Sequence, residues 1–152
     1  MIDAVTFDLD NTLVDFMLMK RNAVEAGIRA MIDAGLDRGF EDIDAIVTQV
    51  YKDEGIEYQR VFNSVLDKLT GEVDHKILAA GILGYRRARE ATLVPYAHVH
   101  MTLFTLARMG MKLGVVSDAP KLEAWLRLCS LNLHHIFDAV VTFEDTGLRK
   151  PN

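Results

Sequence analysis

Three short apolar segments of strand-like composition are separated by helical sequence, and the first separation is much longer than the second. The segments are Ala4–Leu9, Lys112–Val116 and Ala139–Phe143. They are rich in β-branched and aromatic residues and show little polar alternation, a pattern typical of buried strands in parallel sheets. Strands that alternate with helices favour a parallel α/β sheet, because parallel neighbours need a crossover connection. We therefore predict an α/β fold.

The long first separation has helical periodicity throughout. Apolar residues at helical spacing predict about four helices between residues 16 and 90, with breaks at Asp37–Gly39 and Thr70–Glu72. This block is best explained as an α-helical domain inserted after the first strand. Residues 1–15 and 91–152 would then form one discontinuous α/β core.

Two further helices are predicted within the core. One covers Met101–Met109 and ends at Gly110, a residue suited to a helix C-terminus. Pro120 opens the other at its first turn. We expect this second helix to bury one apolar face, made up of Leu122, Trp125, Leu126 and Cys129.

Composition narrows the classes of protein that this chain can belong to. Of the 152 residues, 50% are hydrophobic and 26% are charged, as in soluble globular proteins. A single cysteine builds no disulfide framework, the N-terminus does not resemble a signal peptide, and no apolar stretch approaches the ~20 residues of a membrane span. The net charge of −5 does not favour nucleic acid as a partner. We expect a cytoplasmic protein that binds neither membrane nor nucleic acid.

Two carboxylates follow the first predicted strand, in the run Asp8-Leu9-Asp10-Asn11-Thr12. Ligands of open α/β sheets bind at the carboxyl ends of strands. Two acids this close repel each other unless a cation or a shared proton compensates, so Asp8 and Asp10 indicate a Mg²⁺ site. A calcium loop fits less well, because it requires Gly and Glu where this chain has Leu13 and Met19. The alternative is that Asp10 or Asn11 only caps the next helix.

Polar residues also follow the second and third predicted strands. Ser117 and Asp118 come directly after Val116, and their position before a helix suits phosphate binding. Ordinary helix capping by either residue is the alternative. Lys150 follows the third strand and, taken alone, is explained equally well as a solvated side chain. All three strands end at the same edge of the sheet, so these residues are expected to converge.

Two histidine pairs raise the question of a transition-metal site. His98 and His100 are separated by one residue, and His134 and His135 are adjacent. Neither pair has acids or cysteines at the spacing of a metal motif, so zinc is not predicted.

The combined pattern resembles the haloacid dehalogenase superfamily over essentially the whole chain. Asp8, Asp10 and Thr12 match the first motif, hhhhDxDxT; Ser117 matches the second, and Lys150 followed by Pro matches the third. The resemblance implies a Rossmann-like core, with residues 16–90 as the α-helical cap. It also implies a phosphatase rather than a dehalogenase, because the dehalogenases lack an acid at the position of Asp10.

The resemblance also implies roles for the motif residues. Asp8 would be the nucleophile that forms an aspartyl-phosphate, and Asp10 the general acid and base, with both acids at the Mg²⁺ site. Thr12 would orient the Asp10 loop. The phosphate-binding set would contain Ser117, Asp118, Lys150 and Asn11. The expected substrate is a small phosphorylated metabolite that is a phosphate ester.

One part of the family pattern is missing. The fourth motif, an acidic pair that completes the metal site, follows another helix and strand, whereas this sequence ends at Asn152. We therefore expect a C-terminally truncated core whose first strand lies on an exposed edge, which would favour self-association. Two alternatives stay open: a phosphoacceptor signalling domain, and a non-catalytic fragment or interaction module.

Overall fold

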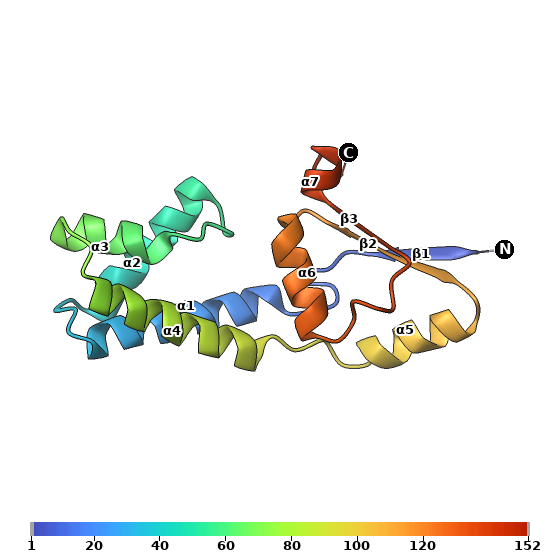
Figure 1. Ribbon diagram of the computed structural model, residues 1–152, viewed down its shortest axis with the longest axis horizontal. Coiled ribbons are helices and arrows are strands. Elements are labelled where there is room, and N and C mark those ends of the chain that lie inside the picture. Colours follow the sequence, from blue (N-terminus) through green and yellow to red (C-terminus); the bar gives the residue numbers. More distant parts are fainter. Residues whose placement is uncertain (1, 152) are drawn as a thin grey trace. The chain divides into compact units, whose positions relative to one another are not determined.

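The computed structural model describes residues 2–151. They divide into two compact units, shown in Figure 1. The core unit comprises the chain up to Met17 together with the chain from Leu93 onward, and the helical unit comprises Leu18–Thr92. The chain thus leaves the core unit shortly after its first strand and returns to it at Leu93.

A three-stranded sheet organises the core unit. The strands β1 (Ala4–Phe7), β2 (Lys112–Ser117) and β3 (Ala139–Thr142) are parallel and lie in the order β1-β2-β3. Phe7 pairs with Val115, and Ser117 pairs with Thr142. The predicted parallel α/β fold is confirmed. Because the strands run in one direction, the segments that follow them leave the sheet at the same edge.

Burial differs between the central strand and its neighbours. In β2, Leu113, Val115 and Ser117 are buried and alternate with more exposed residues, so one face of this strand is covered. The expectation that the first and third strands are buried was wrong. In β1 exposed residues alternate with half-buried ones, and β3 is buried only at Thr142. Both are edge strands in the described chain, so each has a hydrogen-bonded neighbour on one side only.

Three helices follow in the core unit: α5 (Val99–Arg108), α6 (Lys121–Ser130) and the short α7 (Phe143–Thr146). Helix α5 packs against β2. Gly110, just after α5, has a φ of 78°, the left-handed conformation that favours glycine after a helix. Phe143, predicted to belong to the third strand, instead begins α7. Pro120 is the residue before α6 rather than part of its first turn.

The buried face of α6 differs from the one predicted. Leu122 is 69% exposed, and Leu126 and Cys129 are also exposed, whereas Trp125 is half-buried. The buried residues are instead Ala124, Arg127 and Leu128. Counting apolar residues selected the wrong face because the side of α6 that faces the core carries a buried arginine.

Four helices make up the rest of the chain, as predicted: α1 (Phe16–Asp33), α2 (Phe40–Glu54), α3 (Val61–Thr70) and α4 (His75–Thr92). The helical unit has its own apolar core, with Ile28, Met31 and Val65 fully buried. Helices α1 and α4 approach closely at Gly84, where a Cβ atom would lie 2.7 Å from the Ala26 carbonyl oxygen. None of the helices formed by residues 2–151 combines the length and apolar character needed to cross a membrane.

Candidate active site

The loop after β1 carries the two aspartates on either side of a buried leucine. Leu9 is fully buried, and its amide donates a 2.8 Å hydrogen bond to Oδ1 of Asp8. The Leu9 carbonyl accepts a 2.9 Å hydrogen bond from the amide of Leu13, which closes a helical turn. These contacts anchor the loop, so the backbone that carries Asp8 and Asp10 is held against the core. Asp8 itself keeps 41% of its side chain exposed.

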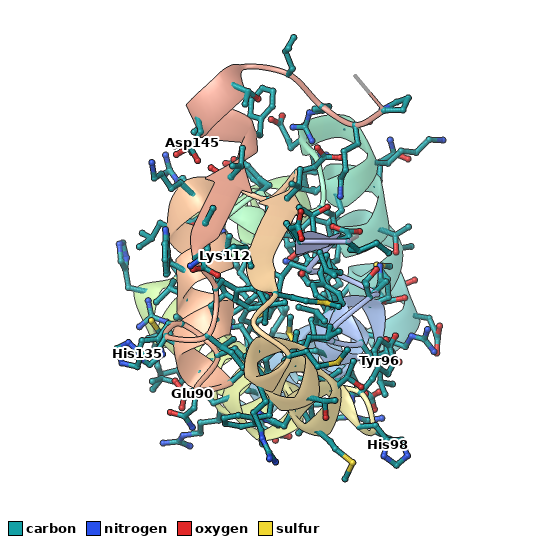
Figure 2. The ribbon with its side chains drawn as sticks, turned by 90° about the vertical axis from the view of Figure 1, so that its right-hand side faces the viewer. Glu90, Tyr96, His98, Lys112, His135 and Asp145 are labelled. Carbon is teal, nitrogen blue, oxygen red and sulfur yellow. The ribbon has the colours of Figure 1, made fainter. Side chains whose placement is uncertain are left out.

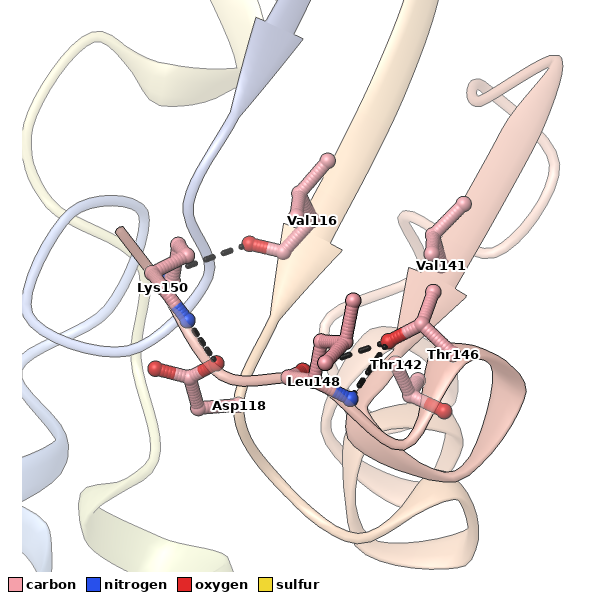
Figure 3. A pocket seen from close by; sticks show the side chains of 7 residues that line it. All are labelled: Val116, Asp118, Val141, Thr142, Thr146, Leu148 and Lys150. Carbon is pink, nitrogen blue, oxygen red and sulfur yellow. Dashed lines mark hydrogen bonds between the residues drawn. The ribbon is translucent and has the colours of Figure 1, made fainter. Parts of the chain in front are cut away.

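Lys150 links the ends of two strands to the loop after the third. Its Nζ lies 2.5 Å from Oδ1 of Asp8 and 3.2 Å from the carbonyl oxygen of Val116. Its amide donates a 3.1 Å hydrogen bond to Oδ1 of Asp118 (Figure 3). Asp8 and Lys150 are 142 residues apart in sequence, yet they form an ion pair. The structure therefore brings Asp8, Asp118 and Lys150 together at the carboxyl edge of the sheet.

A short capped helix positions the loop that carries Lys150. In α7, the amide and the hydroxyl of Thr142 both donate to Oδ2 of Asp145, at 2.9 and 2.8 Å. These contacts belong to a capping box, which satisfies backbone groups at the start of a helix. Asp145 also forms an ion pair with Lys121 of α6. Gly147, with a φ of 69°, ends the helix and turns the chain toward Lys150.

The Asp145 contacts predict a pH effect on stability. The hydrogen bond from Lys121, followed by those from Thr142, lowers the pKa of Asp145 from its ordinary value of 3.8 to about 2. Because the folded pKa is the lower one, the stabilisation is present above 3.8 and is lost as the pH falls from 3.8 to about 2. We expect Asp145→Asn to show a shallower loss of stability over this interval. Denaturant unfolding at several acid pH values measures it.

The control for this prediction is Glu144→Gln, which removes an exposed acid of the same helix. This variant should keep the acid dependence of the unmodified protein. If Asp145→Asn and the unmodified protein lost stability in parallel between pH 3.8 and about 2, the ion pair would not contribute to folding.

Ser117 and Asp118 lie where β2 ends. Ser117 is 3% exposed, and its Oγ accepts a 3.1 Å hydrogen bond from the amide of Ala119. This contact forms a local turn before α6 and does not cap that helix, whose first turn receives no side-chain capping hydrogen bond. A pocket of about 100 Å³ adjoins this strand end (Figure 3). Its lining consists of Val116, Asp118, Val141, Thr142, Thr146, Leu148 and Lys150.

Asn11 and Thr12 occupy the turn beyond the aspartates. Asn11 has a φ of 58°, a left-handed conformation that asparagine tolerates better than most residues. Its Oδ1 accepts a 3.2 Å hydrogen bond from the amide of Met17, in the first turn of α1. The Asn11 side chain therefore accepts a hydrogen bond from an amide in the first turn of α1, as the helix-capping alternative predicted. Thr12 is exposed, and its amide approaches the Leu9 carbonyl oxygen at 3.4 Å.

Arg127 is a charged neighbour of the site that the sequence analysis missed. Only 4% of its side chain is exposed, and its Nη1 donates a 3.0 Å hydrogen bond to Oδ2 of Asp10. A signal was present in the sequence: Arg127 lies three residues after Ala124, on the helix that follows Ser117. The more apolar stripe on the opposite side of that helix concealed it.

One histidine of each pair can be located in Figure 2. His98 and His135 project outward from separate parts of the core unit (Figure 2). The ring centroids of His134 and His135 lie 3.8 Å apart, and the ring planes are tilted by 49°. Among residues 2–151, no group of three or more His, Cys, Asp or Glu side chains is arranged to hold a metal ion.

The fold and this edge define a class of protein. It is a parallel α/β protein with an inserted helical unit, and an Asp-x-Asp loop, a buried serine and a lysine lie at the carboxyl ends of its strands. The chain belongs to the haloacid dehalogenase-like hydrolases, whose family model matches residues 2–152. The resemblance inferred from the motifs is thereby confirmed.

Curated relatives similar to this chain include phosphatases. The chain is 38% identical to a glyceraldehyde 3-phosphate phosphatase of Methanocaldococcus jannaschii and 35% identical to one of Methanothermobacter thermautotrophicus. Each alignment includes the whole of this chain and 67% of the relative. The chain thus spans about two thirds of the length of these curated relatives.

Solved structures support the same fold. The chain aligns with a Thermotoga maritima protein assigned as a β-phosphoglucomutase, with a TM-score of 0.71 and 23% identity. That alignment covers 99% of this chain and 66% of the other. An L-2-haloacid dehalogenase from Xanthobacter autotrophicus aligns with a TM-score of 0.54 and 24% identity, over 100% of this chain and 61% of the other. Because both identities are below 25%, these two structures support the fold alone.

Proposed function

We propose that this chain carries the reaction centre of a phosphatase that acts on a small phosphorylated metabolite. The observation that carries the proposal is the 2.5 Å contact between Lys150 Nζ and Asp8 Oδ1. It places a cation beside an accessible carboxylate, at the sheet edge where α/β proteins bind ligands. The phosphatase relatives support the same reaction class.

In the proposed reaction, an oxygen of Asp8 attacks phosphorus in line with the ester bond. A P–O bond forms to Asp8, the ester P–O bond breaks, and Asp10 gives its proton to the departing alkoxide. Water then attacks phosphorus while Asp10 takes up a proton from it; the P–O bond to Asp8 breaks, which releases phosphate and restores the Asp8 carboxylate. Two smaller barriers replace one large barrier.

The positive charge for this reaction comes from the loop after β3. Lys150 would move from its contact with Asp8 Oδ1 to share a transferring oxygen, while its bond to the Val116 carbonyl keeps it at the strand end. Ser117, buried at the same edge, would donate its hydroxyl to a second oxygen. Such preorganised donors account for much of the rate enhancement in phosphoryl transfer.

The oxygen donors at this edge fit Mg²⁺. Mg²⁺ is usually held by one or two carboxylates and keeps water or substrate phosphate as its other ligands. Asp8 offers a carboxylate that is 41% exposed, and Asp10 follows two residues later. We propose that these two residues hold the ion, Asp8 through its carboxylate and Asp10 through its backbone oxygen, because the Asp10 carboxylate has to exchange protons; when bound, Mg²⁺ would offset negative charge on the phosphoryl group.

Removing divalent cations is expected to abolish phosphate release. Protein stripped with a chelator should lose nearly all activity, and added Mg²⁺ should restore it. Ca²⁺ should restore much less activity. It prefers a larger number of oxygen ligands, at longer distances, than a carboxylate, a backbone oxygen and a phosphate can provide. Phosphate release measured after each addition tests this. Full activity in the presence of chelator would contradict the metal assignment.

The substrate proposal follows the relatives. Their names suggest glyceraldehyde 3-phosphate, a three-carbon phosphate ester, as the first compound to test. The experiment compares phosphate release from glyceraldehyde 3-phosphate, glycerol phosphate, phosphoglycolate and an aryl phosphate in the presence of Mg²⁺. We expect the highest kcat/KM for a three-carbon ester.

The same assay separates the two alternatives. A stable aspartyl-phosphate without turnover would favour a phosphoacceptor signalling domain. The absence both of turnover and of labelling at Asp8 would favour a non-catalytic fragment or interaction module.

A further inference from the structure

A buried arginine lies behind the loop that carries the proposed general acid. Arg127 belongs to α6, the helix that follows Ser117, and only 4% of its side chain is exposed. Arginine is rarely buried unless it is paired, because removing a guanidinium from water is costly. The location of Arg127 therefore requires an explanation.

The guanidinium contacts Asp10 and Phe16 within the core unit. Nη1 donates a 3.0 Å hydrogen bond to Oδ2 of Asp10, which is 117 residues away in sequence. The Cζ atom lies 4.5 Å from the centroid of the Phe16 ring, and Phe16 is 5% exposed. An arginine over an aromatic face is held by electrostatic attraction as well as by packing. Phe16 and Asp10 thus both restrain the position of the guanidinium.

This arrangement restrains Asp10 in turn. The guanidinium is planar and always charged, and its donors have a fixed geometry. The Asp10 side chain is 21% exposed. With Oδ2 held by Arg127, the carboxylate has less rotational freedom than a side chain in water. Positioning of this kind makes proton transfer efficient, because a displacement of about 1 Å can cost 10²-fold in rate.

We propose that Arg127 is a positioning residue that holds the Asp10 carboxylate in the orientation from which it exchanges protons with the leaving group and with water. This inference rests on the proposed function. Arg127 touches neither substrate nor phosphorus in this proposal and acts through Asp10 alone. We therefore expect the loss in kcat on replacing Arg127 to depend on the leaving group of the substrate.

The reason lies in the first step. An alkyl phosphate releases an alkoxide, which needs a proton from Asp10 as the ester P–O bond breaks. An aryl phosphate such as 4-nitrophenyl phosphate releases a stable phenolate, which needs no proton. A misplaced Asp10 should therefore slow the alkyl ester far more than the aryl ester, whereas general loss of structure would slow both alike.

The test compares Arg127→Met and Arg127→Lys with the unmodified protein. Arg127→Met keeps an apolar chain of similar length, and we expect it to lower kcat for an alkyl phosphate by roughly 10²-fold. The aryl phosphate should lose less than about 5-fold, if its leaving group needs no proton. KM should change little for either substrate. Arg127→Lys keeps the charge and should recover part of the alkyl activity.

A matched control comes from the helical unit. Arg29 also has a carboxylate partner, Glu25 at 2.8 Å, and an aromatic neighbour, Phe40, whose ring centroid is 5.2 Å from Cζ. Arg29 is a residue of α1, and its side chain is 64% exposed. Arg29→Met should leave both activities unchanged. If Arg127 acts through Asp10, adding Arg127→Met to Asp10→Asn should cause no further loss for the alkyl ester.

Several outcomes would overturn the inference. One is an equal loss for alkyl and aryl phosphates in Arg127→Met, and another is a full additional loss in the double variant. Failure of the unmodified protein to release phosphate from any ester would refute the proposed function instead. In that case, crystal structures of the unmodified protein and Arg127→Met would still decide the positioning role. Asp10 should change side-chain orientation in the variant, and an unmoved Asp10 would contradict it.

Discussion

Replacing Asp8 with asparagine is expected to lower phosphate release by about 10⁴-fold or more, because it removes the proposed nucleophile. Asparagine keeps nearly the same size and can still accept a hydrogen bond from the amide of Leu9. It cannot form a phosphorylated intermediate of the same kind, and it loses the charge that pairs with Lys150. Steady-state kinetics measures the loss, and acid-quenched labelling shows whether the protein is phosphorylated.

The control for this prediction lies at the opposite end of the same strand. Asp3 precedes β1 and is exposed, and its carbonyl oxygen accepts a 2.9 Å hydrogen bond from the amide of Lys112. Asp3→Asn alters only the side chain and should leave kcat within about 2-fold, as expected of a surface change far from the reaction. Residual activity of Asp8→Asn above a tenth of the unmodified level would refute the nucleophile assignment.

Replacing Lys150 with methionine is expected to lower kcat by about 10²- to 10³-fold, which is typical for loss of one preorganised donor to a transition-state oxygen. The change removes the positive charge beside Asp8 and the hydrogen bond to the Val116 carbonyl. The amide of residue 150 can still donate to Asp118, so the backbone of the loop should stay in place. Measuring kcat and KM separately distinguishes loss of transition-state stabilisation from weaker substrate binding.

Lys112 provides the comparison for this substitution. It begins β2, at the end of the strand away from Lys150, and pairs with Asp138 at 2.8 Å. Its side chain is 74% exposed, and exposed ion pairs contribute little to stability. Lys112→Met should therefore keep full activity. Equal losses in the two variants would mean that Lys150 contributes only general surface charge.

The local pattern was sufficient to predict the elements of the fold. Helical spacing in α1 to α4 and apolar runs in the strands marked the segments, because these periodicities follow from local backbone geometry. Burial of whole strands was predicted less well. Ala4 and Ala139 are exposed because burial depends on how many neighbours the sheet provides, and composition does not encode that number.

The Asp8–Lys150 contact could be anticipated, whereas the environment of Asp10 could not. Parallel strands end at one edge, so residues that follow different strands converge even when they are 142 positions apart. Arg127 was missed for a different reason. Its side chain enters the core through the rotation of α6 about its own axis, which depends on packing, and Leu122, Leu126 and Cys129 were left exposed on the other side.

The amino-acid sequence by itself determined the class of fold, the family and the three strand ends at which the candidate residues gather, since these follow from short motifs and local periodicity. Only the tertiary structure decided which charges meet there. It paired Asp10 with Arg127, used the Asn11 side-chain oxygen to cap α1 and joined the amide of Lys150 to Asp118. The Asp10–Arg127 contact is decided by packing, because two side chains 117 residues apart become neighbours only when the sheet and its helices have assembled.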